Sequence, residues 1–220
     1  MKNIKAIIFD AYGTLFDVNS AAEKCKSKIG DKWENFANYW RKTQLEYTWL
    51  RSLMCRHKDF WKITEDSLDK SMKAFKIDIR MKNELLDLYK ILSPYPEVKG
   101  TLEKLKEKKY KLAILSNGTP ALLNGLVKSN DLQNLFDDIF SIEEVKIYKP
   151  SSKVYDMPIK KYNIKKEDAA FLSANTWDVS GGGNYGFSSV WVNRNNNIFD
   201  NLDYMPKSEI SGLNQLLDIL

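Results

Sequence analysis

Histidine is nearly absent from this sequence, in which His57 is the only example. A single imidazole argues against a histidine-based catalytic triad and against a histidine-rich metal site. Cysteine is also scarce, and Cys25 and Cys55 lie far apart without the spacing of metal ligands. Two such residues in a chain without an export signal are most simply free thiols in a reducing compartment. We therefore expect neither a disulfide framework nor a metal centre.

Long apolar runs are missing as well. No stretch reaches the roughly 18 apolar residues that span a bilayer. The first ten residues, MKNIKAIIFD, have too short an apolar part and become acidic too soon for a signal peptide. These absences predict a cytoplasmic protein with no membrane association.

The residues that are present have the composition of a globular protein. A chain of 220 residues, 43% of them apolar, can bury a large core in one or two domains. The net charge of +5 comes from dispersed lysines, as in KLKEKKYK at residues 104–111. We interpret this run as a solvated face and expect no nucleic-acid partner, although a positive field would favour the approach of small anions.

Short apolar runs, the first of them β-branched, alternate with amphipathic segments over most of the chain. The runs predict strands at 4–9, 111–115, 137–141, 169–172 and 188–192. Between the later runs, the spacing of apolar residues predicts helices at about 98–108, 120–130, 151–162 and 177–185. Strands that alternate with helices predict an α/β fold with a Rossmann-like parallel sheet core and helices on both faces.

The long gap after the first strand breaks this rhythm. Residues 19 to about 94 carry Leu, Trp, Phe and Tyr at three- and four-residue spacing, which is typical of helices. The segment is too long for a crossover connection, so it predicts an inserted helical-bundle cap. Two prolines in SPYPEV, at 93–98, would end it. We assign 1–18 and 95–220 to the core domain and 19–94 to the cap domain.

Polar residues follow three of the predicted strands at the point where each strand ends. Asp10 follows the first, Ser116 and Asn117 the second, and Ser173 and Asn175 a later one. Ligands of open α/β sheets bind beyond the carboxyl ends of the strands, where these side chains would converge. Lys149, which precedes a predicted helix start, would complete such a pocket. By contrast, we interpret the biased run NRNNN at 193–197 as a polar surface loop.

Each of these residues also has a simpler interpretation. Asp10 could cap a turn, as aspartates after strands often do, or it could be a carboxylate nucleophile kept ionised by Lys149. Thr14 and Ser116 could likewise be caps, or hydroxyl donors to an anionic ligand.

Four ordered motifs resemble those of the haloacid dehalogenase superfamily. They are FDAYGTLFD at 9–17, LSNG at 115–118, YKPSSKVY at 148–155 and LSANTWD at 172–178. The resemblance runs from the first strand to the last and includes the position of the cap. The first motif marks only the superfamily, most of whose members are Mg-dependent phosphatases.

Two details narrow the resemblance to the L-2-haloacid dehalogenases. Such phosphatases usually carry a second aspartate two residues after the nucleophile as a general acid, whereas this chain has Tyr12 there. A departing halide needs no proton, so the change fits carbon–halogen cleavage. The last motif is similar to the Ser-Ser-Asn-x-Trp-Asp signature of that family, with Ala174 in place of the second serine. Gly182 stands where Ala is common, and neither departure removes a catalytic group.

The cap agrees with this family. The segment YWRKTQLEYTWLRSLM at 39–54 resembles the helix that brings an arginine over the active site, and Arg41 matches that position. Without the resemblance, Arg41 would be taken for a surface residue of an amphipathic helix. Phe60 and Trp177 match apolar wall positions, although either could be plain core. The resemblance further implies a homodimer, in which this aromatic helix could pair with a second subunit.

The resemblance implies hydrolysis of a small anionic L-2-haloacid without any cofactor or metal. Asp10 would displace the halide, and water activated near Asp178 and Lys149 would cleave the resulting ester. Thr14, Tyr155, Ser173 and Asn175 would orient these groups. The substrate and its halide would be held by Ala11, Tyr12, Arg41, Phe60, Ser116, Asn117 and Trp177. The alternatives are a Mg-dependent small-molecule phosphatase and a catalytically silent binding protein on the same fold.

Overall fold

The described residues, which are 1 and 3–220 of a computed structural model, form a six-stranded parallel sheet in the order β3-β2-β1-β4-β5-β6. The strands are β1 (Ala6–Phe9), β2 (Lys111–Ser116), β3 (Asp138–Ser141), β4 (Ala169–Ser173), β5 (Ser188–Val192) and β6 (Ser208–Ile210). Every residue of β1 and β4 is buried, which explains why these strands are continuously apolar rather than alternating. The parallel α/β fold predicted from the sequence is confirmed, as the similarity to solved structures reported below also shows.

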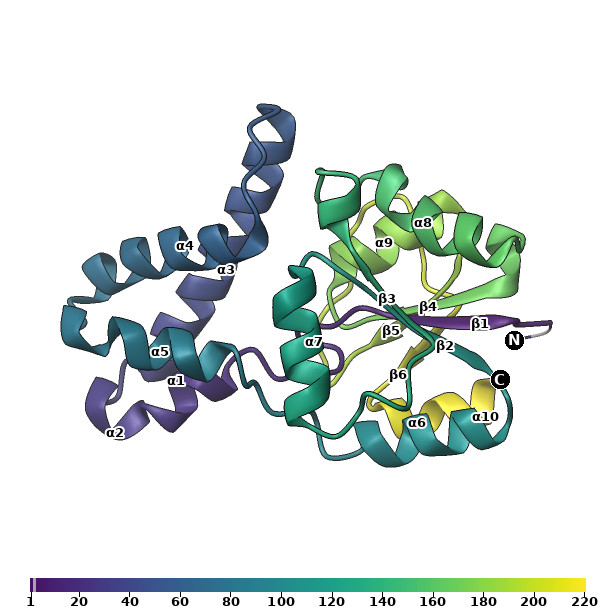
Figure 1. Cartoon of the computed structure of the whole chain (residues 1–220), viewed down its shortest axis with the longest axis horizontal. Coiled ribbons are helices and arrows are strands. Elements are labelled where there is room, and N and C mark those ends of the chain that lie inside the picture. Colours follow the sequence, from purple (N-terminus) through teal and green to yellow (C-terminus); the bar gives the residue numbers. More distant parts are fainter. Residues whose placement is uncertain (2) are drawn as a thin grey trace.

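Helices cover both faces of this sheet (Figure 1). On one face lie α8 (Ser152–Tyr162) and α9 (Thr176–Tyr185), and on the other α6 (Val98–Glu107) and the short α10 (Leu216–Ile219). The helix α7 (Pro120–Ser129) packs beside β3 at the edge of the sheet. The predicted core helices are found with ends within one residue of the expected ones. The strand β6 was not predicted, because three residues, one of them the exposed Glu209, form no apolar run.

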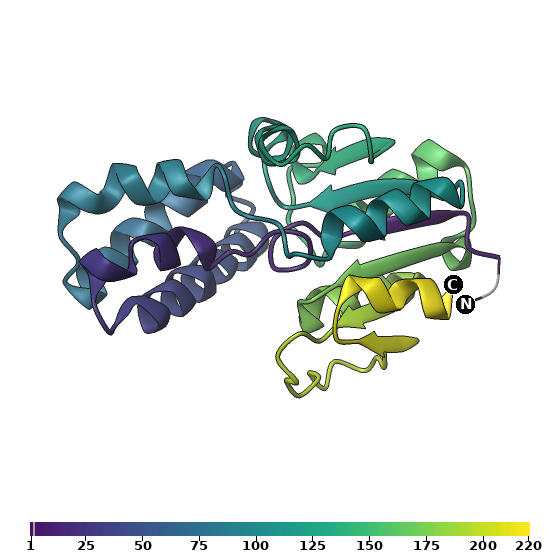
Figure 2. The ribbon, with the colours of Figure 1, turned by 90° about the horizontal axis from the view of Figure 1, so that it is seen from below.

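A helical lobe follows β1, and we call it the cap (Figures 1 and 2). It comprises α1 (Ser20–Lys24), α2 (Lys26–Ile29), α3 (Trp33–Leu53), α4 (Phe60–Phe75), a 3-10 turn at Ile79–Met81 and α5 (Lys82–Tyr89). The expected helical character of 19–94 is therefore confirmed. The exact limits of the two domains stay a prediction.

The long helix α3 forms the spine of the cap and packs against α4. Phe36, Trp40, Gln44 and Thr48 are buried at intervals of four residues, so they make one stripe along α3. A polar contact closes this interface, in which the Gln44 side-chain nitrogen donates to Thr64 Oγ1 over 2.7 Å. None of the described helices is both long and apolar enough to cross a membrane.

Two chain segments join the cap to the sheet, and they pair with each other on the way. Asp17 donates its backbone N–H to Ser93 over 2.8 Å, and Tyr95 donates to Leu15 over 3.0 Å. Figure 2 shows the outgoing and returning segments running side by side between the two lobes. We call these two paired segments, residues 14–17 and 93–97, the linker between the cap and the core.

Candidate active site

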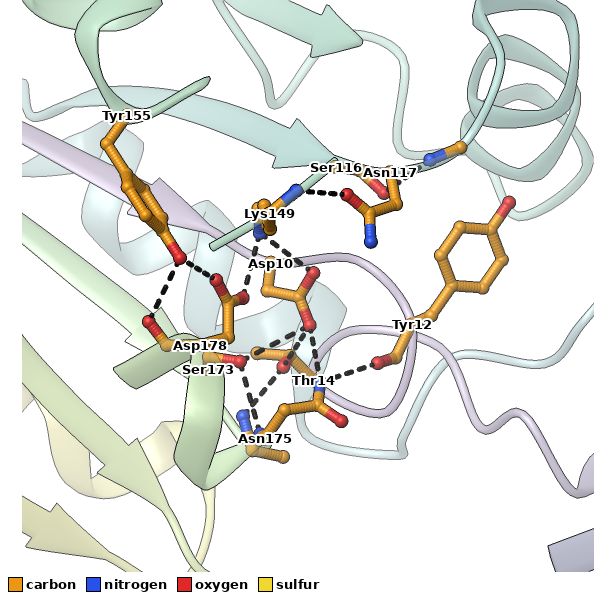
Figure 3. A network of polar contacts seen from close by, with 12 residues as sticks. Asp10, Tyr12, Thr14, Ser116, Asn117, Lys149, Tyr155, Ser173, Asn175 and Asp178 are labelled. Atoms are coloured by element: carbon orange, nitrogen blue, oxygen red, sulfur yellow. Dashed lines mark hydrogen bonds and ion pairs between the residues drawn. The ribbon is translucent and has the colours of Figure 1, made fainter. Parts of the chain in front are cut away.

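The carboxyl ends of β1, β2 and β4 bring the expected polar residues together (Figure 3). These three strands are neighbours in the sheet, so their last residues lie at one edge. Asp10 follows β1, Ser116 ends β2 and Ser173 ends β4, and all three are buried. The structure thus brings together the polar residues that follow three of the predicted strands.

Asp10 is the most heavily contacted side chain of the group. Its Oδ2 accepts hydrogen bonds from Thr14 Oγ1 at 3.1 Å, Asn175 Nδ2 at 2.9 Å and Ser173 Oγ at 3.4 Å. Its Oδ1 contacts Lys149 Nζ at 3.1 Å. Asn175 stands at the N-cap position of α9, yet its amide reaches back to Asp10. Together these donors hold the Asp10 side chain in one orientation.

Lys149 lies between two carboxylates in the wholly buried part of the site. Its ammonium is 3.1 Å from Asp10 Oδ1 and 2.8 Å from Asp178 Oδ2. Asp178 lies in the first turn of α9, and its Oδ1 accepts a 2.7 Å hydrogen bond from Tyr155 on α8. Buried charges persist only when they are paired and hydrogen-bonded, as they are here. Two carboxylates and one ammonium leave this cluster with one net negative charge.

Burial and neighbouring charges shift the pKa values of Asp178 and Lys149. It raises the pKa of Asp178 to about 6, although attraction to Lys149 acts to lower it, and Asp10 raises it further. Burial alone would lower the pKa of Lys149, but the pull of Asp10 and Asp178 outweighs this and raises it. An aspartate with a pKa near 6, ionised at neutral pH beside a held ammonium, can accept a proton from water.

Ser116 and Asn117 form the β2 side of the site. Ser116 Oγ accepts the Gly118 N–H at 3.1 Å, so its own proton remains to be donated to a ligand. Asn117 Oδ1 accepts the backbone N–H of Lys149 at 3.1 Å, which ties the Lys149 segment to β2. The Asn117 amide nitrogen is the part of this side chain left for other contacts.

The cap contributes Arg41 and Phe60 to the turn that follows Asp10. Arg41 on α3 is half-buried, and its Nη2 lies 3.4 Å from the Tyr12 carbonyl oxygen. Phe60, at the start of α4, is fully buried, with its ring centroid 5.2 Å from that of Tyr12. The Tyr12 ring points away from Asp10 (Figure 3), so no acid group stands at that position beside the carboxylate. Ala11 is buried in the turn itself, where its carbonyl accepts three backbone N–H groups.

Comparisons with known proteins agree with this geometry. A family model described as haloacid dehalogenase-like hydrolase matches residues 4–186. (S)-2-haloacid dehalogenase 1 of Pseudomonas sp. (strain CBS-3) is 40% identical over 222 residues, covering 100% of this chain and 98% of that protein. (S)-2-haloacid dehalogenase 4A of Burkholderia cepacia is 36% identical over 221 residues, covering 99% and 95%.

Solved structures give the same result. A crystal structure of a dehalogenase superposes with a TM-score of 0.98 at 36% identity, covering 100% of this chain and 98% of the other. The L-2-haloacid dehalogenase from Xanthobacter autotrophicus, with chloropropionic acid covalently bound, superposes with a TM-score of 0.91 at 30% identity and covers 98% of both chains. The chain belongs to the haloacid dehalogenase-like hydrolases. Within them, its similarity throughout its length is to the (S)-2-haloacid dehalogenases.

In this haloacid dehalogenase-like chain, two residues outside the expected set contact the site. Trp49 on α3 packs edge-on against Trp177 of α9, with ring centroids 5.4 Å apart, and thereby joins the cap to the core. The sequence feature that could have indicated Trp49 is its position eight residues after Arg41 on the same predicted helix. Arg194 approaches Thr14 from the end of β5, with Nη2 2.9 Å from the Thr14 carbonyl oxygen.

Arg194 corrects one expectation. Residues 195–197 are exposed, as expected for a polar surface loop, but Asn193 is buried and Arg194 is largely covered. The surrounding asparagines hid this, because composition alone does not show which way one side chain turns. Elsewhere, no group of three or more His, Cys, Asp or Glu in residues 1 and 3–220 is arranged to hold a metal ion. Independence from cofactors stays a prediction for this haloacid dehalogenase-like chain.

Proposed function

We propose that this protein hydrolyses (S)-2-haloacids to (R)-2-hydroxy acids through an ester formed on Asp10. The observation that carries the proposal is the combination of an Asp10 carboxyl group held by four side chains with Tyr12 two residues later. Lys149 and Asn175 hold the two Asp10 oxygens in place, and the Tyr12 ring points away from them. A halide leaves as an anion without needing an acid, whereas the alcohol released from a phosphate ester does need one.

The first step joins substrate to enzyme. The substrate carboxylate rests against the Ser116 hydroxyl and the backbone amides of Ala11 and Tyr12. An Asp10 oxygen attacks carbon 2 from the side opposite the halide, and the carbon–halogen bond breaks as the new carbon–oxygen bond forms. Oδ1 is the better placed nucleophile, because Oδ2 already accepts three hydrogen bonds while Oδ1 contacts Lys149.

Cationic and apolar groups stabilise the departing halide. Arg41 and the Asn117 amide donate to it, while Phe60 and Trp177 exclude water. A unit charge pair about 4 Å apart is worth about 4 kcal/mol at an effective dielectric near 20. Because the buried cluster carries one net negative charge and the substrate adds another, a cap cation such as Arg41 is needed to offset the repulsion.

The second step regenerates the enzyme. Water near Asp178 and Lys149 loses a proton to the Asp178 carboxylate, and its oxygen adds to the Asp10 carbonyl carbon. The bond from that carbon to the Asp10 oxygen now attached to carbon 2 breaks, so this oxygen leaves with the product, which takes up a proton to become the hydroxy acid, and the water oxygen stays on Asp10. Thr14, Tyr155, Ser173 and Asn175 position the reacting groups through the hydrogen bonds described above.

Halide release from (S)-2-chloropropionate tests the proposal and its rivals together. We expect chloride and (R)-lactate in equal amounts, at a rate that EDTA leaves unchanged. The (R)-substrate should be nearly inert, since exchanging hydrogen and methyl on carbon 2 pushes the methyl group into a packed polar wall. A misplacement of about 1 Å can cost about a hundredfold in rate.

Three other results would contradict the proposed function or its mechanism. Phosphate release from small phosphate esters that stops with EDTA would indicate the Mg-dependent phosphatase. Ligand binding with no turnover of either substrate class would indicate a silent binding protein. Racemic lactate, or lactate with retained configuration, would contradict a single back-side displacement.

We also propose that the chain forms a homodimer, that 19–94 is a separate cap domain, and that the protein acts in the cytoplasm. Leu50, Leu53 and Met54, at the free end of α3, are exposed apolar residues that a second subunit could cover. Light scattering of the wild type against Leu53→Lys tests the dimer. A monomeric mass for both would contradict it.

A further inference from the structure

Arg194 leaves the end of β5 and turns back into the protein. Its side chain is 13% exposed, whereas the asparagines at 195–197 that follow it are exposed. A guanidinium has to find hydrogen-bonding partners when it is covered to this degree. The residues that the Arg194 guanidinium contacts therefore indicate its role.

Those partners belong to both segments of the linker between cap and core. Nη2 donates to the Thr14 carbonyl oxygen over 2.9 Å on the outgoing segment. On the returning segment, Nη1 pairs with the Glu97 carboxylate, and the guanidinium carbon lies 3.9 Å from the centroid of the Tyr95 ring. Arg194 therefore contacts the two segments at the place where Tyr95 and Leu15 pair through their backbones.

Residues of the core fix both Glu97 and Arg194 in place. Glu97 also accepts the backbone N–H of Leu213 at 3.2 Å, and Arg194 lies two residues after the end of β5, a strand paired on both sides in the sheet. A planar guanidinium that donates to two acceptors while it stacks on an aromatic ring has little freedom to rotate. The linker is thus fixed to the sheet at one point.

Thr14 connects that point to the reacting carboxylate. Its backbone carbonyl accepts from Arg194, while its hydroxyl donates to Asp10 Oδ2 at 3.1 Å and accepts the Ala174 N–H at 2.8 Å. Moving the carbonyl turns the peptide and with it the hydroxyl. The same displacement would alter the linker, and hence the place of Arg41 above the site.

We propose that Arg194 is a positioning residue that sets the orientation of Asp10 and the placement of the cap together. The effect on rate rests on the function proposed above. Neither the Asp10 contacts nor the cap helices alone supply this coupling, since Arg194 is the side chain that contacts Thr14, Tyr95 and Glu97 at once.

The test removes the guanidinium and then returns it from solution. In Arg194→Ala we expect halide release in a single turnover to slow by about ten- to a hundredfold, the range that misplacement of the reacting groups produces. Millimolar methylguanidinium should restore at least part of that rate, and methylammonium should not, because only the former reproduces the planar donor pair. Arg80→Ala is the matched control, since the Arg80 side chain is 87% exposed.

A second readout does not depend on activity. Hydrogen–deuterium exchange of the backbone amides at 13–17 and 93–98 should be faster in Arg194→Ala than in the wild type, with exchange in β1 and β4 unchanged. Near-normal halide release, or a loss that methylguanidinium does not relieve, would overturn the proposal. If the wild type releases no halide, the proposed function fails, and exchange alone decides the role of Arg194: unchanged linker exchange then refutes it.

Discussion

The Tyr155 hydroxyl donates a 2.7 Å hydrogen bond to Asp178 Oδ1, and neither side chain is exposed to solvent. This bond opposes the effect of burial, which raises the pKa of Asp178 to about 6. The second step of the proposed reaction needs Asp178 ionised, so Tyr155 helps keep the base available near neutral pH.

The pH dependence of ester hydrolysis should report this bond. In the wild type the rate should be half-maximal near pH 6, where half of Asp178 is ionised, rise to its full value well above that pH and fall below it. Removing the donor in Tyr155→Phe should raise the pKa of Asp178 further and move this limb upward by about one to two pH units, because such bonds to charged groups are worth about 1.5–3 kcal/mol. Tyr185→Phe is the control, since the Tyr185 hydroxyl donates to Asp156. A limb that stays in place in Tyr155→Phe would exclude Asp178 as the titrating base.

Asp10→Asn should lower halide release by about a thousandfold or more, because a neutral amide is not a nucleophile towards carbon 2. The control is Asp87→Asn, which removes an exposed carboxylate on α5. Mass spectrometry after one turnover of the wild type in ¹⁸O-water should find the label in Asp10 and not in lactate. Label that enters lactate directly would instead indicate attack by water on the substrate.

Arg41→Ala should reduce the rate of halide release by about a hundredfold while the protein stays folded. The reduction is smaller than a fully buried ion pair would give, because Arg41 is half-buried and solvent screens part of its charge. Arg41→Lys keeps the positive charge but loses the planar pair of donors, so its rate of halide release should lie between the rates of the wild type and Arg41→Ala. Single-turnover kinetics measure the rate of halide release. A near-normal rate in Arg41→Ala would indicate that Arg41 is only a surface residue of α3.

Gly181 should not tolerate a side chain. A methyl group there would lie 2.5 Å from the Tyr155 hydroxyl oxygen and 2.6 Å from Pro150 Cβ. Gly181→Ala should therefore displace Tyr155 from Asp178, reduce turnover and lower the free energy of unfolding by about 1–3 kcal/mol. Gly100→Ala, inside α6 where a methyl group meets nothing within 4 Å, should raise it by about 0.4–1 kcal/mol. Denaturant unfolding of both variants decides, and equal stabilities would contradict the proposed contact.

Local patterns in the chain were enough to predict most of the fold. The runs that became β1, β2, β4 and β5 are short, mostly apolar and followed by turn residues, and each was found to within two residues. The same patterns placed Asp10, Ser116 and Ser173 at strand ends, from which their convergence follows by the geometry of a parallel sheet. Gly182, noted as a departure from the family, proved to be tightly packed against the Phe171 ring, which leaves no room for a side chain.

The contacts that make the site a reacting centre depend on the assembled fold. Lys149 and Asp10 are 139 residues apart in sequence, and only the order of the strands brings their side chains to 3.1 Å. Arg194 lies in a run of asparagines, and nothing in this local sequence indicates that its side chain contacts Thr14, 180 residues earlier. Neighbours along the chain determine whether a segment becomes a strand or a helix, because those preferences act over a few residues. Which donor meets which oxygen is decided by packing between distant segments, where the burial of a charge has to be matched by a partner.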